Sequence, residues 1–519
     1  LEYRMKYIMP KGFHDGFSGN TNYYDSFRDC LEKGKAYIEY DKKKAEYAKD
    51  TGNIRRGIGV AAFWYNTAVY PISLETSSNR MLLNLDGTVT MQCGETEIGQ
   101  GADTAYSQMT AEAVGLKSYK DVHVVSCQDT DITPTGLGAY ASRQTYVAGF
   151  SIRQTATQLR QKILAYATKL TRQAVDNMDI VDGNIVRRQD GAVLMSLKEL
   201  AMTAQYNAAD SEHITAESTY TIRNNAYSFG CTFVDIEVDI PMCKVTLKRI
   251  INVHDCGSLI NPALAEAQVH GGMSMAIGYG MSEQLLFDEK TGKPLNNNLL
   301  DYKLSTFMDH PHLEAQFVEN PEPTSPFGTK ALGEPPACSG APAIRNAILN
   351  AYELKTGLTR STLRQMMDRP AWMTAQTAKR RGFIDEVLFA GDGDLEVEES
   401  EDAEAEGYES SSARAAALQI PSAAILRAEK RVWDELSPCA ASIAEARRHR
   451  TCVRIDDTGS AKWHSIENAI ISPLMQGMSD GALIETSGMP IEDKRPEKET
   501  KTETGGETPD QEEKRLLRE

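Results

Sequence analysis

Short apolar segments alternate with longer amphipathic segments over the first 350 residues. Five segments rich in Val, Ile, Leu and Thr lie between turn residues, a pattern typical of β-strands. They are residues 81–85, 89–93, 122–126, 233–238 and 244–253. Between residues 152 and 170, apolar side chains recur at helical spacing with polar residues between them, which predicts a long amphipathic helix. Strands and helices do not alternate strictly, so the pattern predicts an α+β fold.

A second helix is expected after Asn261-Pro262. Asn is a favoured N-cap and Pro is favoured in the first turn, so the helix should run from Pro262 towards Gly278. The paired Gly271-Gly272 weakens this expectation, because glycine inside a helix is destabilising.

The chain changes character after residue 350. Residues 350–390 are mostly helical in pattern, and residues 391–410 form an acidic linker whose like charges should keep it solvated. Residues 411–488 are a partly helical region without an assigned role, and residues 489–519 read as a disordered charged tail. A docking role for the acidic segment is the alternative to a linker.

Charge and composition exclude several classes of protein. The net charge is −17, with 73 acidic against 56 basic residues, which disfavours nonspecific nucleic-acid binding. No run approaches the ~20 apolar residues of a membrane span. The nine cysteines contain no CxxC pair, which argues against a zinc ribbon or a cysteine-ligated iron–sulfur cluster in this chain and favours free thiols in the cytoplasm. The chain opens without Met, so we expect a fragment.

The first candidate site is the turn Gly99-Gln100-Gly101, within residues 95–104. It lies between an expected strand and an expected helix. Such a turn can leave backbone N–H groups free for an anion or an oxo group, and Gln100 offers an amide donor. The alternative is an ordinary tight turn.

The second candidate is residues 133–145, which are rich in Gly, Ser, Thr and Ala and lead into a helix. Small residues permit close approach of a ligand, and Ser142, Arg143 and Thr145 supply donors. This loop could wrap a phosphorylated cofactor, and the alternative is a plain helix entry.

Two single residues complete the set. Gln268 stands two residues before the paired glycines and could face a close-packed site, although a surface position is the alternative. Glu334 precedes Pro335-Pro336, which favours an extended and rigid backbone. Its apolar neighbours should enclose the carboxylate and make it a better general base. The alternative is a structural or exposed glutamate.

Together, and in this order, these motifs resemble the molybdenum-binding subunit of the xanthine dehydrogenase and aldehyde oxidoreductase family, the molybdenum hydroxylases. The resemblance covers residues 1–349 as a molybdopterin-binding domain and rests on residues 95–104, 138–145, 255–262 with Gln268, and 328–336. It implies that Glu334 is the catalytic base. It also implies that molybdenum is held through the pterin, with no protein metal ligand. The cofactor-binding residues that it implies are Gly99, Gln100, Gly101, Ala141, Ser142, Arg143, Thr145 and Gln268.

The resemblance further implies an oxidoreductase. It would hydroxylate an electron-poor carbon of a purine, an N-heterocycle or an aldehyde, with water as the oxygen source, as in purine metabolism. The cofactor would be molybdopterin in its mono- or dinucleotide form. Iron–sulfur and FAD groups would lie on partner chains, with no nucleic acid or membrane as partner. The first half of the family's subunit, with its Gly-Gly-Phe-Gly-Gly type loop, has no counterpart here.

Residues 350–390 resemble the C-terminal end of phage-type Clp serine peptidases, on residues 352–358, 366–376 and 382–387. The nucleophile and histidine segments of that family have no counterpart. Asp368 could lie near the family's acidic position, or it is a helix-end residue. The GxSxG string at 477–481 lacks the strand that a nucleophile elbow needs. The alternative functions are therefore a peptidase remnant, or a chimeric reading frame in which residues 350–519 make no stable contact with residues 1–349.

Overall fold

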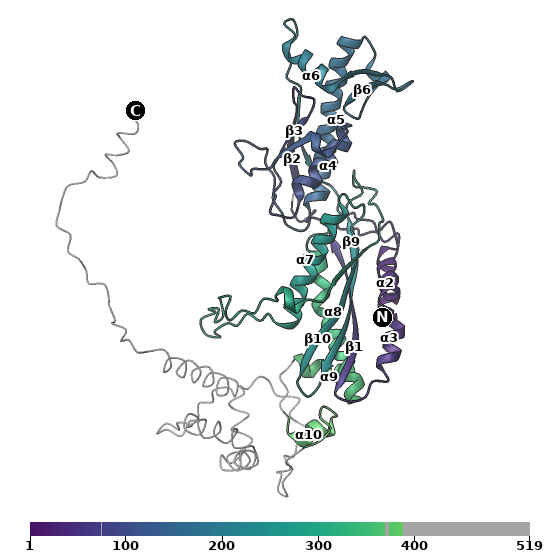
Figure 1. Cartoon of the computed structure of the whole chain (residues 1–519), viewed down its shortest axis with the longest axis vertical. Coiled ribbons are helices and arrows are strands. Elements are labelled where there is room, and N and C mark those ends of the chain that lie inside the picture. The colour runs from purple at the N-terminus through teal and green to yellow at the C-terminus, as the bar shows by residue number, and fades with distance from the viewer. Residues whose placement is uncertain (74, 369–372, 388–519) are drawn as a thin grey trace, which may run out of the picture. The chain divides into compact units, whose positions relative to one another are not determined.

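The computed structural model describes residues 1–73, 75–368 and 373–387 (Figure 1). The expected linker at 391–410, the region 411–488, the tail 489–519 and the string at 477–481 lie outside the described residues. The described part is a mixture of helices and mainly antiparallel sheets, as the α+β expectation requires. None of the described helices combines the length and the apolar character needed to cross a membrane.

One four-stranded sheet forms the frame. Its strands pair in the order β1 (Ile54–Asn66), β9 (Tyr227–Asp239), β10 (Lys244–Asp255) and β11 (Leu313–Phe317), all antiparallel except β10 with β11. Helices cover both faces, so β9 is buried along nearly its whole length. Figure 1 shows the two layers. The helices are α7 (Pro262–Met281) and α8 (Pro335–Thr356) on one face, and α2 (Ser26–Tyr37) and α3 (Tyr40–Tyr47) on the other.

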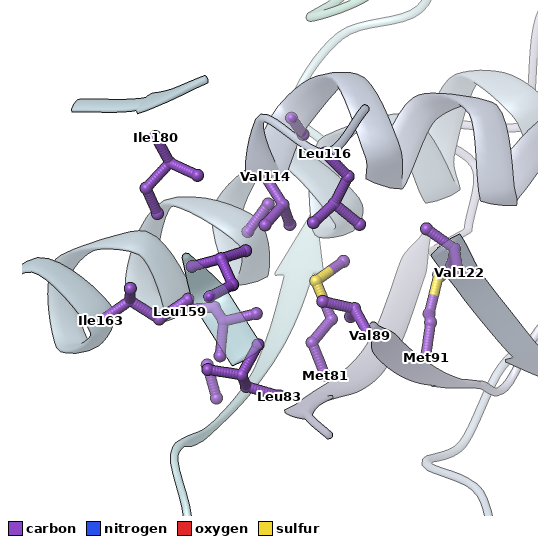
Figure 2. Close-up of a cluster of buried hydrophobic side chains, with 14 of the residues drawn as sticks. Met81, Leu83, Val89, Met91, Val114, Leu116, Val122, Leu159, Ile163 and Ile180 are labelled. Carbon is purple, nitrogen blue, oxygen red and sulfur yellow. The ribbon is translucent and has the colours of Figure 1, made fainter. Parts of the chain in front are cut away.

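A second sheet has its own core. Its strand order is β4 (Val122–Val125), β3 (Val89–Cys93), β2 (Thr76–Leu83) and β8 (Thr215–Thr221), and α4 (Ala102–Val114) and α5 (Gln144–Thr171) pack against it. Figure 2 shows that Leu159 and Ile163 of α5 face Met81 and Leu83 of β2 across this core. The remaining described elements are β5 (Met178–Val181), β6 (Asn184–Arg187), β7 (Val193–Ser196), α1 (Glu2–Lys6), α6 (Leu197–Tyr206), α9 (Arg360–Asp368), α10 (Ala375–Arg380), and the 3-10 helices Tyr119–Asp121, Val175–Asn177 and Phe307–Asp309.

The five expected strands are present as β2, β3, β4, β9 and β10, with β2, β9 and β10 longer than expected. Strand β2 begins five residues earlier and ends two residues earlier than the expected 81–85. The helix expected after Asn261 is α7, and Asn261 caps it by accepting the Leu264 N–H at 3.1 Å. The sequence pattern did not predict strand β1, because Gly57 and Gly59 interrupt its apolar residues.

Those glycines let α8 lie directly on β1. A Cβ added at Gly59 would lie 2.2 Å from the Ala343 carbonyl oxygen, and one added at Gly57 would lie 2.2 Å from that of Ala347. Gly272 plays the same part between α7 and α8, because its Cβ would lie 2.7 Å from Pro336 Cβ. The glycine that weakens α7 locally is therefore required by the packing of α7 on α8.

Helix α8 crosses position 349 without interruption. Ala347 and Ala351 belong to one buried cluster, and Asn350 Oδ1 accepts the Ile58 N–H at 3.2 Å. Leu363 of α9 is also buried. The expectation that residues from 350 onward make no stable contact with the first part is therefore wrong for the start of that segment, because the apolar face of α8 continues through it.

The glycine packing can be tested within one helix. Gly272→Ala should destabilise the protein by about 1–3 kcal/mol, because overpacking displaces α8. Gly271→Ala, where an added Cβ meets nothing within 4 Å, should be neutral or stabilising by about 0.5–1 kcal/mol. The free energy of unfolding in urea compares the two variants. Equal effects would contradict the close packing.

His254 makes the fold sensitive to acid. It is fully buried on β10, with Nε2 2.9 Å from Ser228 Oγ and 3.1 Å from the Ala331 carbonyl oxygen. Burial lowers the pKa of His254 from 6.5 to about 4. The unfolded chain therefore binds a proton between pH 6.5 and 4 that the folded chain does not, so the His254 contribution to stability, complete above pH 6.5, is lost as the pH falls through this window.

His254→Gln retains an amide that can donate to the Ala331 carbonyl but does not titrate in this window. The stability that the parent loses between pH 7 and pH 5 should exceed the loss in the variant by about 2 kcal/mol. Urea unfolding at the two pH values measures the difference. Parallel losses in the two proteins would rule out His254 as the titrating group.

Candidate active site

The four segments that the sequence singles out meet where helices α4, α5, α7 and α8 begin. Gln100 Nε2 donates to Gln144 Oε1 at 2.8 Å, which joins the first segment to the start of α5. A Cβ added at Gly101 would lie 2.7 Å from the Leu264 side chain, which places the start of α4 against α7. The Glu334 N–H donates to Ser142 Oγ at 2.9 Å, which joins α8 to the second segment.

Gln268 completes the cluster from α7. A Cβ added at Gly333 would lie 3.7 Å from Gln268 Oε1 and 3.5 Å from Ser142 Oγ, so these two side chains flank the residue before Glu334. In the part of the chain that the structure describes, the Gln268 amide has no hydrogen-bond partner. Its two N–H donors are therefore available to a ligand at this point.

The Glu334 carboxylate is held from two sides. Its Oε2 accepts hydrogen bonds from Ser142 Oγ, at 3.0 Å, and from the Tyr65 hydroxyl. Its Oε1 has no partner among the described residues. The arrangement leaves one oxygen oriented and uncommitted, which suits a group that exchanges a proton.

Two expectations about Glu334 are wrong. Its backbone is helical, with φ −83° and ψ −36°, although it is the N-cap of α8 and precedes Pro335. The favoured place of proline in a first turn, together with the bond from the Glu334 N–H to Ser142, outweighs the extended preference of a residue before proline. The side chain is also exposed in this chain and is not enclosed by its apolar neighbours.

Tyr65 is a site residue whose pairing with Glu334 the sequence did not identify. It lies near the end of β1 and is half-buried. Burial and, secondly, the hydrogen bond to Glu334 raise its pKa, so the phenol remains a donor across the physiological pH range. In the sequence, residues 63–65 stand out only as aromatic. Tyr65 and Glu334 are separated by 269 positions, so no local pattern indicates that they pair.

The entry into α5 is strained and open. Ala141 and Ser142 both have φ +47°, a left-handed conformation that costs non-glycine residues about 1–2 kcal/mol each. The N-cap of α5, Arg143, makes no side-chain cap bond, and the first turn holds no acidic residue. Thr145, in that turn, has no side-chain hydrogen bond among the described residues. An uncapped helix start with free donors is suited to an anion.

Arg143 does not offer its side chain to a ligand, contrary to expectation. Its guanidinium is fully buried and pairs with Glu75 and with Glu95, whose Oε2 is 2.8 Å away. It also donates to the Gly138 carbonyl oxygen at 3.1 Å. Burial raises the pKa of Glu95, and the charge of Arg143 opposes that shift. Arg143 therefore connects the buried side of the strained loop to glutamates that flank β2 and β3.

The Gly99-Gln100-Gly101 turn is closed on itself, which corrects a further expectation. Glu97 accepts the N–H groups of Gly99 at 2.7 Å, Gly101 at 3.2 Å and Asp103 at 3.0 Å. Partial burial alone would raise the pKa of Glu97, but these backbone donors lower it. The donors expected to be free for an anion are therefore already used.

Gln100 is likewise engaged, since its amide donates to the Thr96 carbonyl oxygen and to Gln144, each at 2.8 Å. Gln144 also donates to the Thr96 carbonyl oxygen at 3.0 Å. Gln144, another residue that the sequence did not identify, thus fastens the first segment to α5. Gln100 shapes the wall of the site and does not supply a free donor.

The available groups are the Thr145 hydroxyl, the Gln268 amide and backbone N–H groups, since the Ser142 and Tyr65 hydroxyls donate to Glu334. Among the described residues there is no group of three or more His, Cys, Asp or Glu side chains placed to hold a metal ion. This donor set fits an anionic organic ligand that is bound through hydrogen bonds.

Comparison with known proteins gives two family matches. Residues 33–311 match the family model described as a molybdopterin cofactor-binding domain, which is more than half of the chain. Residues 340–391 match the family model for Clp protease. In that second segment Asp368 pairs with Arg345 at the end of α9, and the segment contains one serine, Ser361, and no histidine.

Individual relatives agree with the first match. The chain is 46% identical over 364 residues to the xanthine dehydrogenase molybdenum-binding subunit of Escherichia coli O157:H7, covering 70% of this chain and 48% of that protein. It is 28% identical over 367 residues to the carbon monoxide dehydrogenase large chain of Afipia carboxidovorans, covering 67% of this chain and 44% of that protein. The chain thus spans about half the length of these relatives.

A solved structure shares the fold. Quinoline 2-oxidoreductase from Pseudomonas putida 86 superposes with a TM-score of 0.63 at 24% identity, over 71% of this chain and 49% of that one. The shared architecture extends through most of the described residues.

The buried ion cluster gives a stability prediction. Arg143→Met leaves Glu75 and Glu95 without their cation and should cost about 3–5 kcal/mol. The cost should be smaller at pH 5 than at pH 8, because the raised pKa of Glu95 favours its neutral form. Arg153→Met, an exposed arginine on the same helix, is the control and should cost less than about 1 kcal/mol. Urea unfolding distinguishes these outcomes, and equal costs would contradict the role of the cluster.

Proposed function

The chain belongs to the family of molybdopterin cofactor-binding domains, and from this premise we propose that it forms part of the molybdenum-binding subunit of a molybdenum hydroxylase. Its reaction would be hydroxylation of an electron-poor carbon with water as the oxygen source. The observation that carries the proposal is the position of Glu334. Its carboxylate lies between Ser142 and Tyr65, close to the unpaired Gln268 amide and the open start of α5.

The chain's own residues would hold the cofactor in different ways. Thr145 and Gln268 would supply side-chain donors, and the uncapped start of α5 would supply backbone N–H groups. Ser142, whose hydroxyl donates to Glu334 Oε2, would line the cofactor without donating to it. Ala141 would allow close approach. Gly99, Gln100 and Gly101 would form a wall, and Arg143 would position the loop. When bound, the molybdenum held by molybdopterin would supply the two-electron redox chemistry that no side chain here can provide.

Glu334 would act as the general base. Its Oε1 would accept the proton released as oxygen is transferred to the substrate carbon. Ser142 and Tyr65 would keep the carboxylate in one orientation through Oε2. Orientation of this kind lowers the entropic part of the barrier, and a positioned base contributes about 10²–10⁴-fold in rate.

We propose a purine as the substrate class, with other N-heterocycles and aldehydes as alternatives. The support is the identity of 46% to a xanthine dehydrogenase subunit. Electrons would pass to iron–sulfur and FAD groups on partner chains, a proposal supported by the names of the relatives, which describe a subunit and a large chain. We also propose a cytoplasmic location, since the seven cysteines in the described residues are free thiols.

From sequence resemblance we propose 1–349 as the cofactor-binding part and 350–390 as the Clp-like segment, a boundary that falls within the continuous helix α8. A Clp peptidase remnant remains the alternative function for that segment, supported by the second family match. Because the segment has no histidine, it would need residues from elsewhere to build a catalytic triad.

Glu334→Gln tests the assigned base in a complex completed by the other half of the subunit. Turnover should fall by about 10²–10⁴-fold while the molybdenum content stays at the parent level. Glu319→Gln, an exposed carboxylate on another segment, should leave turnover unchanged. Steady-state hydroxylation assays and metal analysis give the two readouts. Full turnover in Glu334→Gln would refute the role of this residue.

A further inference from the structure

Helix α7 carries few charged residues and is covered on only one face. Its twenty residues include one acidic residue, Glu266, and no lysine or arginine. Apart from a polar stripe of Glu266, His270 and Ser274, its surface is mostly apolar, and apolar helix faces are normally buried. One face packs on α8 and the first sheet through Val269, Met273 and Ile277. The opposite face exposes four residues at four-residue spacing, which are Ala267, Gly271, Met275 and Tyr279.

The chain after α7 continues this exposed apolar surface. Residues 282–309 leave the end of α7 as the long projection seen beside it in Figure 1. Phe307 is 89% exposed and Leu299 is 82% exposed. Seven further large apolar residues of this arm are exposed, namely Leu285, Leu286, Phe287, Leu295, Leu300, Leu304 and Met308.

The arm has a defined conformation. Leu295 N donates to the Leu286 carbonyl oxygen at 2.8 Å, and Asn296 accepts the Leu286 N–H at 2.9 Å. Asp288 caps the turn by accepting the Thr291 N–H at 2.7 Å. Tyr302 is tied to Glu283 by a hydrogen bond of 2.7 Å. A single hairpin without a core is marginal in water, so a specific shape that presents apolar side chains indicates a binding surface.

We propose that the exposed face of α7 and the arm 282–309, together the α7–arm surface, bind the half of the subunit that has no counterpart in this chain. The chain covers only 48% of the xanthine dehydrogenase subunit that it resembles. The α7–arm surface lies within residues 33–311, so it belongs to the cofactor-binding module itself. It also begins next to Gln268, so its occupant would cover the open side of the site. The inference rests on the proposed membership of a molybdenum-binding subunit and goes beyond the proposed reaction.

The full chain is co-expressed with a tagged polypeptide comprising the residues of the Escherichia coli O157:H7 subunit that the alignment leaves unmatched. We expect copurification at a 1:1 ratio. Amide hydrogen exchange should slow at least tenfold within residues 282–309 of the complex. The double variant Leu300→Glu/Phe307→Glu should reduce recovery at least tenfold. Both side chains are exposed, so its melting temperature should match the parent.

Met242→Glu is the matched control, because this methionine is 73% exposed at the turn between β9 and β10. It should copurify like the parent. Failure of the parent to bind, or equal recovery of the double variant, overturns the proposal. So does a dimer of the chain alone on sedimentation that the double variant dissociates, since the surface would then bind a second copy. The assay needs no cofactor or turnover, so its result is separate from that of the Glu334 test.

Discussion

The close approach of α8 to β1 and α7 determines where the candidate site lies. Gly57, Gly59 and Gly272 remove the side chains that would otherwise separate these elements. The start of α8 is thereby held against the end of β1 and the side of α7. Glu334, as its N-cap, then meets Tyr65 and lies near Gln268. Without this close packing of α8 on β1 and α7, Glu334 would not be brought next to Tyr65 and Gln268.

In the second segment, residues 133–145, buried charges stabilise the loop, and hydrogen-bond donors on its outer side remain accessible. Arg143 and its two glutamates are inaccessible and hold the loop in a conformation that non-glycine residues avoid. The strained conformation of Ala141 and Ser142 is maintained because the buried ion pairs of Arg143 and the hydrogen bond from Ser142 to Glu334 constrain the same few residues. What remains outside is a set of uncommitted hydrogen-bond donors, which is the property that an anionic cofactor requires.

Several groups that are expected to be covered by protein are exposed to solvent in this chain. Glu334, the uncovered face of α7 and the arm are all accessible in a chain that spans about half of its relatives. A catalytic base functions best when water is excluded, and an apolar arm is stable when it is covered. The association that we propose for the α7–arm surface would meet both requirements.

The sequence by itself determined the local elements. Alternating apolar residues predicted the strands, and Asn261-Pro262 predicted the start of α7, because backbone preferences and capping act over a few residues. The motifs also located the candidate site, although not the part that each residue plays in it. Only the tertiary structure assigned Glu97 to the α4 turn and buried Arg143, and only it paired Tyr65 with Glu334 across 269 positions. Side-chain partners at such distances depend on how helices and sheets pack, and no local pattern encodes that packing.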